Sequence, residues 1–162
     1  MREDDIGGLA RELGRACERR GVMVATAESC TGGGVAEAIT RIAGCSAWFD
    51  RAFITYSNEA KVAMLGVREA TLAAHGAVSE AVACEMAAGT LEHSLARVGV
   101  AVTGIAGPGG ATPGKPVGTV WFAWAASGDA VQARLVRLRG DRQAIRRQAV
   151  AVALRGLVDL TR

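Results

Sequence analysis

Proline, aromatic residues and long apolar runs are all scarce in this chain, and each scarcity narrows what the protein can be. Only three prolines occur among 162 residues, half of which are hydrophobic, so the composition is typical of a folded chain rather than a disordered one. No apolar run approaches the ~18 residues of a membrane span. The length allows one well-buried core, and we expect a single domain over residues 1–162.

Paired cysteines and apolar leader sequences are also missing. The four cysteines form no C-x-x-C pair, which argues against a zinc site and against a disulfide framework and favours a reducing compartment. The start, Met1–Asp5, is acidic and lacks the apolar core of a signal peptide. We therefore expect a cytoplasmic protein with no metal, no cofactor and no membrane segment.

Lysine is rare, because seventeen of the nineteen basic residues are arginine and the two lysines are Lys61 and Lys115. Where a positive charge alone suffices, this sequence uses arginine. A retained lysine therefore suggests a role that depends on losing a proton, which a guanidinium does not do. Chance could also leave two lysines, and a surface role is favoured for Lys115 in its proline-flanked loop.

The charged residues are unevenly distributed along the chain. Residues 1–92 hold nine Lys/Arg and thirteen Asp/Glu, whereas residues 93–162 hold ten and three. A solvated strand and helix face explains the basic excess, and the alternative is that one or two arginines hold a phosphate or carboxylate. A nucleic-acid surface is disfavoured, because the few aromatic residues do not alternate with basic ones. The basic residues concerned are Arg134, Arg137, Arg139, Arg142, Arg146 and Arg147.

Apolar spacing and turn residues predict strands that alternate with helices. Strands are expected at Val22–Ala27, Trp48–Tyr56, Val98–Thr103, Val117–Ala126 and Ala130–Leu138, the last two as a hairpin. Helices are expected over residues 6–21, 34–43, 58–65, 68–74, 79–94 and 141–160. This order predicts an α/β three-layer sandwich, with a mainly parallel sheet, an antiparallel hairpin and helices on both faces.

Ligands bind such sheets outside the carboxyl ends of the strands. Three predicted strands lead into segments rich in polar or glycine residues, which we expect to meet at one crevice. These segments are Glu28–Gly34, Tyr56–Lys61 and Thr103–Lys115.

The turn after the first predicted strand carries the clearest chemical signal. A partly β-branched apolar run ends at Glu28-Ser-Cys-Thr, and three glycines precede the next helix. Backbone N–H groups at a helix N-terminus lack partners and favour negative charge. Ser29 could therefore be a nucleophile beside N–H groups of Cys30 to Gly33 that hold an oxyanion, or it could be an ordinary helix cap. Glu28 is expected to orient the turn by hydrogen bonding rather than to act as an acid.

Other residues could also serve as nucleophile or base. A Cys30 thiolate at a helix N-terminus would be activated, although a small buried cysteine is the simpler interpretation. His75 could complete a Ser-His-Asp triad, whereas His93 at a helix end fits a surface role. Tyr56 is either strand-end packing or a hydroxyl beside Lys61.

Five motifs follow one another along the chain: Glu28-Ser-Cys-Thr-Gly-Gly33, Thr55-Tyr-Ser-Asn58 with Lys61, His75-Gly-Ala-Val-Ser79, Val102-Thr-Gly-Ile-Ala-Gly-Pro-Gly-Gly110 and Gly140-Asp-Arg142. Together they closely resemble the CinA C-terminal domain family, which includes stand-alone nicotinamide-nucleotide amidases of the PncC type. The resemblance runs from about Leu9 to Leu160. One small departure is Gly44-Cys45-Ser46, where the family more usually has Gly-Ala-Ser.

The resemblance implies a single α/β domain that hydrolyses the carboxamide of nicotinamide mononucleotide to nicotinate mononucleotide and ammonia. Ser29 and Lys61 would form the catalytic pair, with Tyr56 as a third candidate. The chemistry is consistent with this, because amide hydrolysis needs a nucleophile, a base, an oxyanion cradle and a proton for ammonia. Lys61 can supply base and acid if burial or a nearby positive charge lowers its pKa from ~10.4.

Substrate binding is assigned to the glycine-rich turns and to one arginine. The loop Thr103–Lys115 lacks the ending of a Walker motif, but its length indicates a ligand-facing role. Arg142 is the preferred phosphate partner and Ser46 a second one. The expected binding set is Thr31, Gly32, Gly33, Ser46, Thr103, Gly104, Gly107 and Arg142.

A second hypothesis is a non-catalytic nucleotide-binding or interaction module linked to competence or to the DNA damage response, as the family's name reflects. A third is an amidase for another carboxamide. In each case the expected ligand is a small molecule, chiefly a nucleotide. The Ala-rich helices and the Trp121–Trp124 strand have apolar faces that could form a homodimer or larger homo-oligomer, as similar proteins do.

Overall fold

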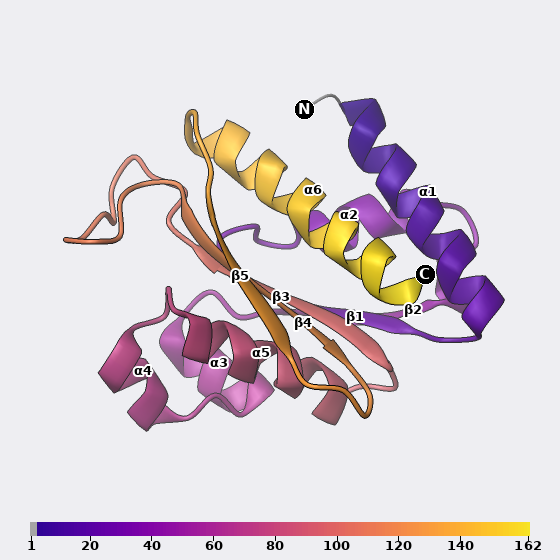
Figure 1. The fold of residues 1–162 in the computed structure, drawn as a ribbon, viewed down its shortest axis with the longest axis horizontal. Helices are drawn as coiled ribbons and strands as arrows, with labels where there is room; N and C mark the ends of the chain where they lie inside the picture. Colours follow the sequence, from indigo (N-terminus) through magenta and orange to yellow (C-terminus); the bar gives the residue numbers. More distant parts are fainter. Residues whose placement is uncertain (1–2) are drawn as a thin grey trace.

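A five-stranded sheet with the order β2-β1-β3-β4-β5 lies at the centre of the computed structural model, which describes residues 3–162 (Figure 1). β1 pairs in parallel with both β2 and β3, whereas β4 is antiparallel to both β3 and β5. The predicted parallel sheet with an attached antiparallel hairpin is therefore confirmed. The strands are β1 (Val24–Glu28), β2 (Phe49–Ile54), β3 (Val98–Gly104), β4 (Thr119–Ala126) and β5 (Gln132–Arg137).

Helices cover both faces of the sheet, as the three-layer prediction requires (Figure 1). One face carries α1 (Glu3–Arg20), α2 (Gly34–Thr40) and α6 (Arg142–Thr161). The other face carries α3 (Asn58–Leu65), α4 (Glu69–His75) and α5 (Glu80–Glu92). A short 3-10 helix, Cys45–Ala47, was not predicted and precedes β2. No helix among residues 3–162 is long and apolar enough to cross a bilayer, and the acidic start Met1–Asp5 lies partly outside the described residues.

Each face of the sheet has its own hydrophobic core. The core under α1, α2 and α6 includes Leu13, Ile39 and Phe122, all fully or almost fully buried. The core under α3 and α5 is built around Leu65 and Met86. Because alternate residues of a strand point to opposite faces, the buried strands β1 and β3 supply side chains to both cores.

Two helical glycines give a stability prediction. A Cβ at Gly156 of α6 would overlap the indole ring of Trp124, whereas a Cβ at Gly8 of α1 meets no atom within 4 Å. We expect Gly156→Ala to lower the free energy of unfolding by about 1–3 kcal/mol through overpacking. Gly8→Ala should raise it by about 0.5–1 kcal/mol, because alanine is the better helix former. Urea denaturation measures both, and equal effects in the two variants would contradict the packing described here.

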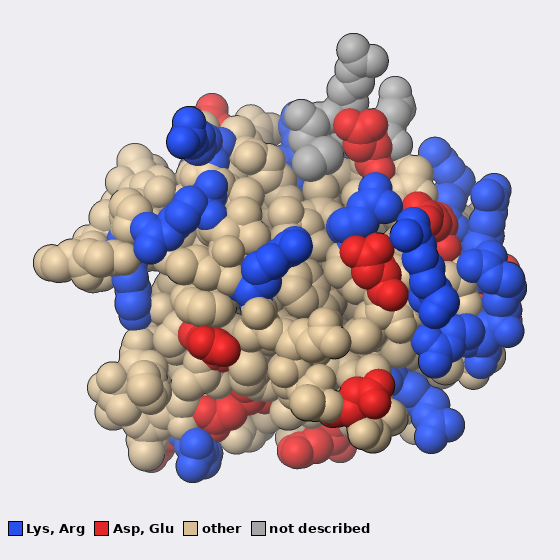
Figure 2. Space-filling model, in the orientation of Figure 1, with Lys and Arg blue, Asp and Glu red and all other residues tan. Residues whose placement is uncertain are grey.

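On the face shown in Figure 2, basic side chains gather at the right-hand end with acidic side chains among them, and charges of both signs are scattered over the rest. Several arginines have partners. The Arg162 guanidinium lies 2.7 Å from a Glu12 carboxylate oxygen, and Arg134 lies over the ring of Trp124, 5.5 Å from its centroid. Exposed pairs of this kind contribute little to stability, and they fit the interpretation of a solvated face.

The sheet topology determines where a ligand site can form. Glu28 at the end of β1 is in register with Ile54 of β2 and with Val102 of β3, so the carboxyl ends of the three parallel strands lie side by side. The chain leaves β1 over one face, through α2, and leaves β2 over the other, through α3 to α5 (Figure 1). The crevice where such connections diverge is the usual ligand site of an open α/β sheet.

Candidate active site

Ser29 and Lys61 meet at the carboxyl ends of the parallel strands. Ser29 follows β1 directly, and Lys61 lies on α3, where Ser57 caps the helix by accepting a hydrogen bond from the Ala60 N–H at 3.0 Å. The Lys61 Nζ lies 3.1 Å from the Ser29 Oγ. The same nitrogen donates to the backbone carbonyls of Thr55 at 2.8 Å and Tyr56 at 3.1 Å.

This amine has three polar neighbours, a number that suits either protonation state. As an ammonium group it can donate a hydrogen bond to each of them. As a neutral amine it can donate its two hydrogens to the Thr55 and Tyr56 carbonyls and present its lone pair to the Ser29 hydroxyl. Lys61 is only 1% exposed, and this burial lowers its pKa below the ordinary 10.5, because the charged form loses hydration.

A buried carboxylate organises the turn that carries Ser29. Glu28 is fully buried and accepts hydrogen bonds from the Thr31 hydroxyl at 2.7 Å and from the backbone N–H groups of Val35 at 2.9 Å and Ala36 at 3.0 Å. It also accepts one from Thr26 at 3.2 Å. Glu28 therefore orients the turn, as expected from the sequence.

This carboxylate also limits which N–H groups near Ser29 can hold an oxyanion. The first N–H groups of α2 are not open to an anion, because Glu28 occupies those of Val35 and Ala36. The Gly32 N–H donates to the Ser29 carbonyl at 3.1 Å. Within the described part of the chain, the N–H groups of Cys30 and Thr31 have no backbone carbonyl as acceptor. The Gly33 N–H also has no backbone acceptor there, so the donors left for an oxyanion in this turn are those of Cys30, Thr31 and Gly33.

Cys30 lines the same crevice as Ser29 but is not ionised at neutral pH. Its side chain is 6% exposed, and burial raises the pKa of the thiol to about 11. A thiol with this pKa keeps its proton and is a poor nucleophile. The geometry therefore favours the simpler interpretation of Cys30 as a small buried residue.

Six of the residues predicted from the sequence line one crevice of about 240 Å³: Ser29, Tyr56, Lys61, Thr103, Gly104 and Arg142. The Thr103 hydroxyl is buried and donates to the Ala77 carbonyl at 2.9 Å, so it supports the crevice wall. Arg142 donates through Nη1 to the Gly107 carbonyl at 2.7 Å. Tyr56 is 67% exposed and lies at the crevice rather than in the core.

The other predicted binding residues do not line this crevice, and each has a local reason. Thr31 gives its hydroxyl to Glu28. Gly32 and Gly33 have φ values of 58° and 101°, which side chains rarely adopt, so glycine is needed there to close the turn. Ser46 is exposed on the 3-10 helix before β2, and Gly107 contributes its carbonyl to Arg142 rather than to the crevice lining.

Two features of the site were missed from the sequence. Ala77 and Val78 form part of the crevice wall; they belong to the motif His75–Ser79, but no role was assigned to them from the sequence. Arg146 of α6 donates from Nε to the Cys30 carbonyl and from Nη2 to the Thr31 carbonyl, both at 3.1 Å. Its position one helical turn after Arg142 was the available hint, because residues four apart share a helix face.

The histidine alternatives find no support in the geometry. Neither His75 nor His93 lines the crevice, and the His93 ring nitrogen Nδ1 lies 2.9 Å from the Gly89 carbonyl on its own helix end. Lys115 donates to the His75 carbonyl at 2.9 Å, which ties the long loop to the end of α4. Among residues 3–162, no three His, Cys, Asp or Glu side chains are placed to hold a metal ion.

Thr55 offers a test of how the crevice tolerates change. Its hydroxyl is buried, and no hydrogen-bond partner for it lies in the described part of the chain. We expect Thr55→Val to raise the free energy of unfolding by about 1 kcal/mol, because an unsatisfied hydroxyl is removed. The Thr55 carbonyl, which accepts a hydrogen bond from Lys61, is unchanged, so kcat should stay within twofold of the wild-type value. Thermal unfolding measures the stability and steady-state kinetics measures kcat. A larger loss of kcat would mean that the hydroxyl has a role in the reaction.

Known proteins resemble this chain over nearly its whole length. The family model of the CinA C-terminal domain matches residues 7–161. The nicotinamide-nucleotide amidohydrolase PncC of Escherichia coli strain K12 is 56% identical over 158 residues, which cover 97% of this chain and 95% of the relative. The protein of the same name from Pseudomonas putida is 51% identical over 157 residues, which cover 97% of this chain and 98% of that relative.

Solved structures agree with these matches. The crystal structure of the competence/damage inducible protein CihA from Agrobacterium tumefaciens has a TM-score of 0.94 at 49% identity, covering 98% of this chain and 96% of that chain. A structure from Escherichia coli, described as a competence-damaged protein (CinA) superfamily protein, has a TM-score of 0.93 at 36% identity. The match covers 99% of this chain and 93% of that chain. From its sequence and its fold alike, the chain belongs to the CinA C-terminal domain family.

Proposed function

We propose that this protein hydrolyses the carboxamide of nicotinamide mononucleotide to nicotinate mononucleotide and ammonia, with Ser29 as nucleophile and Lys61 as base and acid. The observation that carries the proposal is the 3.1 Å contact between the Lys61 amine and the Ser29 hydroxyl in a buried crevice. The substrate is inferred from relatives at 51–56% identity, which are named nicotinamide-nucleotide amidohydrolases.

In the first step, the neutral Lys61 amine takes the Ser29 proton while the Ser29 Oγ attacks the carboxamide carbon. The lowered pKa of Lys61 makes the neutral form available. The cationic pyridinium ring of the substrate disfavours a second positive charge nearby and acts in the same direction. The carbonyl oxygen becomes an oxyanion, which the N–H groups of Cys30 and Thr31 can stabilise because no backbone carbonyl in the described chain accepts from them.

In the second step, the tetrahedral intermediate collapses and the C–N bond breaks. The Lys61 ammonium returns its proton to the leaving nitrogen, which departs as ammonia, and an ester to Ser29 remains. A water molecule then attacks the ester with Lys61 again as base. Breakage of the bond to Ser29 Oγ releases the carboxylic acid and restores the hydroxyl.

The rest of the nucleotide is assigned to the crevice mouth. Arg142 uses Nη1 for the Gly107 carbonyl, and its remaining guanidinium nitrogens can bind the phosphate. Tyr56 is exposed at the same crevice and can pack against the pyridinium ring, an arrangement that aromatic faces favour for cations. The expected homo-oligomer and cytoplasmic location remain predictions, which light scattering and cell fractionation test.

The function is tested by incubating the purified protein with nicotinamide mononucleotide and following ammonia and nicotinate mononucleotide together. We expect equal amounts of both products, with much lower rates on free nicotinamide, which lacks the phosphate. A nucleotide that binds in calorimetry and is recovered unchanged would contradict the proposal and support the non-catalytic module. A preference for free nicotinamide over the nucleotide would contradict the phosphate contact.

A further inference from the structure

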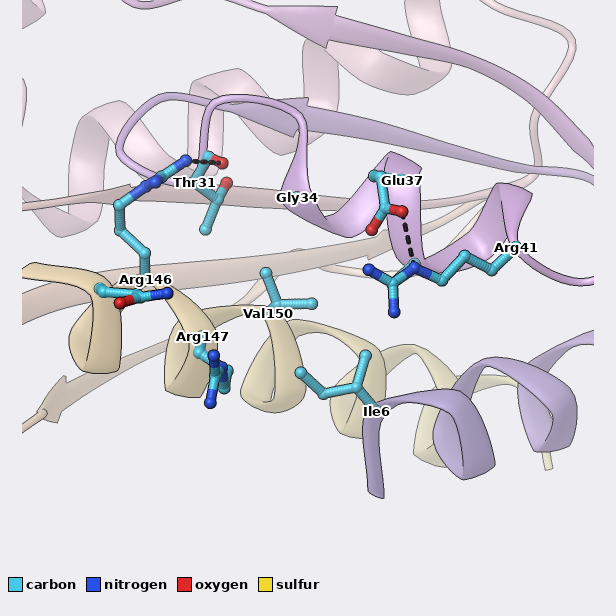
Figure 3. A pocket seen from close by; sticks show the side chains of 10 residues that line it. Ile6, Thr31, Gly34, Glu37, Arg41, Arg146, Arg147 and Val150 are labelled. Atoms are coloured by element: carbon cyan, nitrogen blue, oxygen red, sulfur yellow. Dashed lines mark hydrogen bonds and ion pairs between the residues drawn. The ribbon is translucent and has the colours of Figure 1, made fainter. Parts of the chain in front are cut away.

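A second cleft lies between α2 and α6, on the other side of the turn that carries Ser29 (Figure 3). Its volume is about 220 Å³. It shares no lining residue with the catalytic crevice, although Thr31 and Gln143 of the cleft directly follow Cys30 and Arg142 of the crevice. The two sites are therefore separate neighbours.

The cleft is rich in positive charge. Arg41 enters it from α2, and Arg146 and Arg147 enter it from α6, with Glu37 as the one carboxylate on its lining (Figure 3). The Arg41 Nε lies 2.6 Å from the Glu37 Oε1. Arg146 donates to the Cys30 and Thr31 carbonyls, which leaves its charge unneutralised. For Arg147, the residues described provide no acceptor and no ion pair.

The shape of the cleft limits what can enter it. A Cβ at Gly34 would lie 2.9 Å from the Val150 Cγ2, so α2 and α6 approach closely at its floor. The apolar part of the cleft lining consists of Ile6, Ala38 and Val150. Pockets for drug-sized ligands usually measure ~300–1,000 Å³, so a cleft of about 220 Å³ suits a small ion or one group of a larger molecule.

The arrangement of charges favours a phosphate-class anion over a carboxylate. Three guanidinium groups reach the cleft from two facing helices, with one carboxylate opposing them. A tetrahedral oxyanion presents oxygens in several directions and can accept from both walls at once, whereas a planar carboxylate presents two oxygens on one side.

We propose that the cleft between α2 and α6 is a second anion site that binds a phosphoryl group, either free inorganic phosphate or the phosphate of a nucleotide. Arg147 is its principal donor, with Arg41 completing the contact from the opposite wall. Glu37 opposes the bound anion and sets its affinity. The proposal does not depend on the amidase function, because it concerns binding at residues outside the catalytic crevice.

The test is calorimetric titration of the full chain with inorganic phosphate at low ionic strength. We expect saturable binding that Arg147→Gln weakens about tenfold, the loss of one charge-assisted hydrogen bond. Glu37→Gln should strengthen binding several-fold, because it removes the opposing charge. Arg155→Gln is the matched control: it removes the same charge two turns along α6, where Arg155 lies 3.7 Å from Glu12 and outside the cleft, and should leave binding unchanged.

Three results would overturn the proposal: no saturable binding, equal weakening by Arg147→Gln and Arg155→Gln, or a loss caused by Arg142→Gln alone. The last would assign the phosphate to the catalytic crevice. A second arm uses adenosine monophosphate. If adenosine monophosphate binds with the same affinity as inorganic phosphate, the ligand is free phosphate, and if it binds more tightly, the ligand is a nucleotide. In both cases Arg147→Gln must weaken the binding. If the protein bound phosphate as expected but did not hydrolyse nicotinamide mononucleotide, the proposed function would be wrong and the second anion site would still be supported.

Discussion

Lys61→Met is expected to lower kcat for amide hydrolysis by about 10⁴-fold or more, the scale seen when a member of a nucleophile–base pair is removed. The side chain is 1% exposed, and methionine fills a similar volume without a charge, so the fold should persist. Lys61→Arg should be nearly as inactive. A guanidinium keeps the positive charge but does not deprotonate, and this separates a base from a simple electrostatic role.

The same residue predicts how activity and stability depend on pH. A protonated Lys61 cannot accept the Ser29 proton, so kcat should fall as the pH falls through its lowered pKa. Between that pKa and the ordinary value of 10.5, the unfolded chain carries a proton on Lys61 that the folded chain does not. The free energy of unfolding should therefore rise with pH across this window, and Lys61→Met should remove that rise.

Lys115→Met is the matched control, because it changes the one other lysine. Lys115 lies in the long loop and donates to the His75 carbonyl, away from the crevice. Its replacement should leave kcat within about twofold, on the scale of a surface substitution. Stopped assays of ammonia release over a range of pH give both profiles. If Lys61→Met kept a tenth of the wild-type kcat, another group would have to be the base.

Ser29→Ala is expected to reduce kcat by about 10⁴-fold or more as well, since no alternative nucleophile in the crevice is activated. The neighbouring Cys30 thiol has its pKa raised to about 11 by burial and stays protonated at neutral pH. The variant should still bind nicotinamide mononucleotide with nearly unchanged Kd, because the lost hydroxyl acts on the carboxamide carbon rather than on the phosphate.

Calorimetry and kinetics on Ser29→Ala separate binding from chemistry. Ser127→Ala serves as its control, because Ser127 is exposed at the turn between β4 and β5 and follows Ala126, which pairs with Val98 at the end of β3 opposite the crevice. Loss of both kcat and nucleotide affinity in Ser29→Ala, with an unchanged Tm, would mean that the hydroxyl binds substrate and is not the nucleophile.

The fold followed closely from the sequence because its signals are local. Strand β1 is a short apolar run that ends in a glycine turn, and α6 begins where Asp141 accepts a hydrogen bond from the Ala144 N–H at 2.8 Å. Ser29 and Lys61 were found because each belongs to a motif. Their contact required only that the carboxyl ends of parallel strands lie side by side.

What the sequence does not display is the hydrogen bonding within the turn. Thr31, Gly32 and Gly33 were expected to bind substrate, and the structure shows the Thr31 hydroxyl donating to Glu28 and the Gly32 N–H donating to the Ser29 carbonyl. Arg146 contacts the Cys30 carbonyl across 116 positions of sequence. No local pattern reports such a distance, and the cleft between α2 and α6 was hidden for the same reason.

The two hydrogen bonds from Arg146 to the turn also bear on when the protein becomes active during its synthesis. The ribosome adds Ser29, the proposed nucleophile, well before it adds α6 and the Arg146 side chain that braces its turn. A nascent polypeptide still lacking α6 therefore exposes Ser29 on an unbraced turn. Ribosomal products that terminate before this helix should be catalytically silent, so hydrolysis is expected only after α6 has been made.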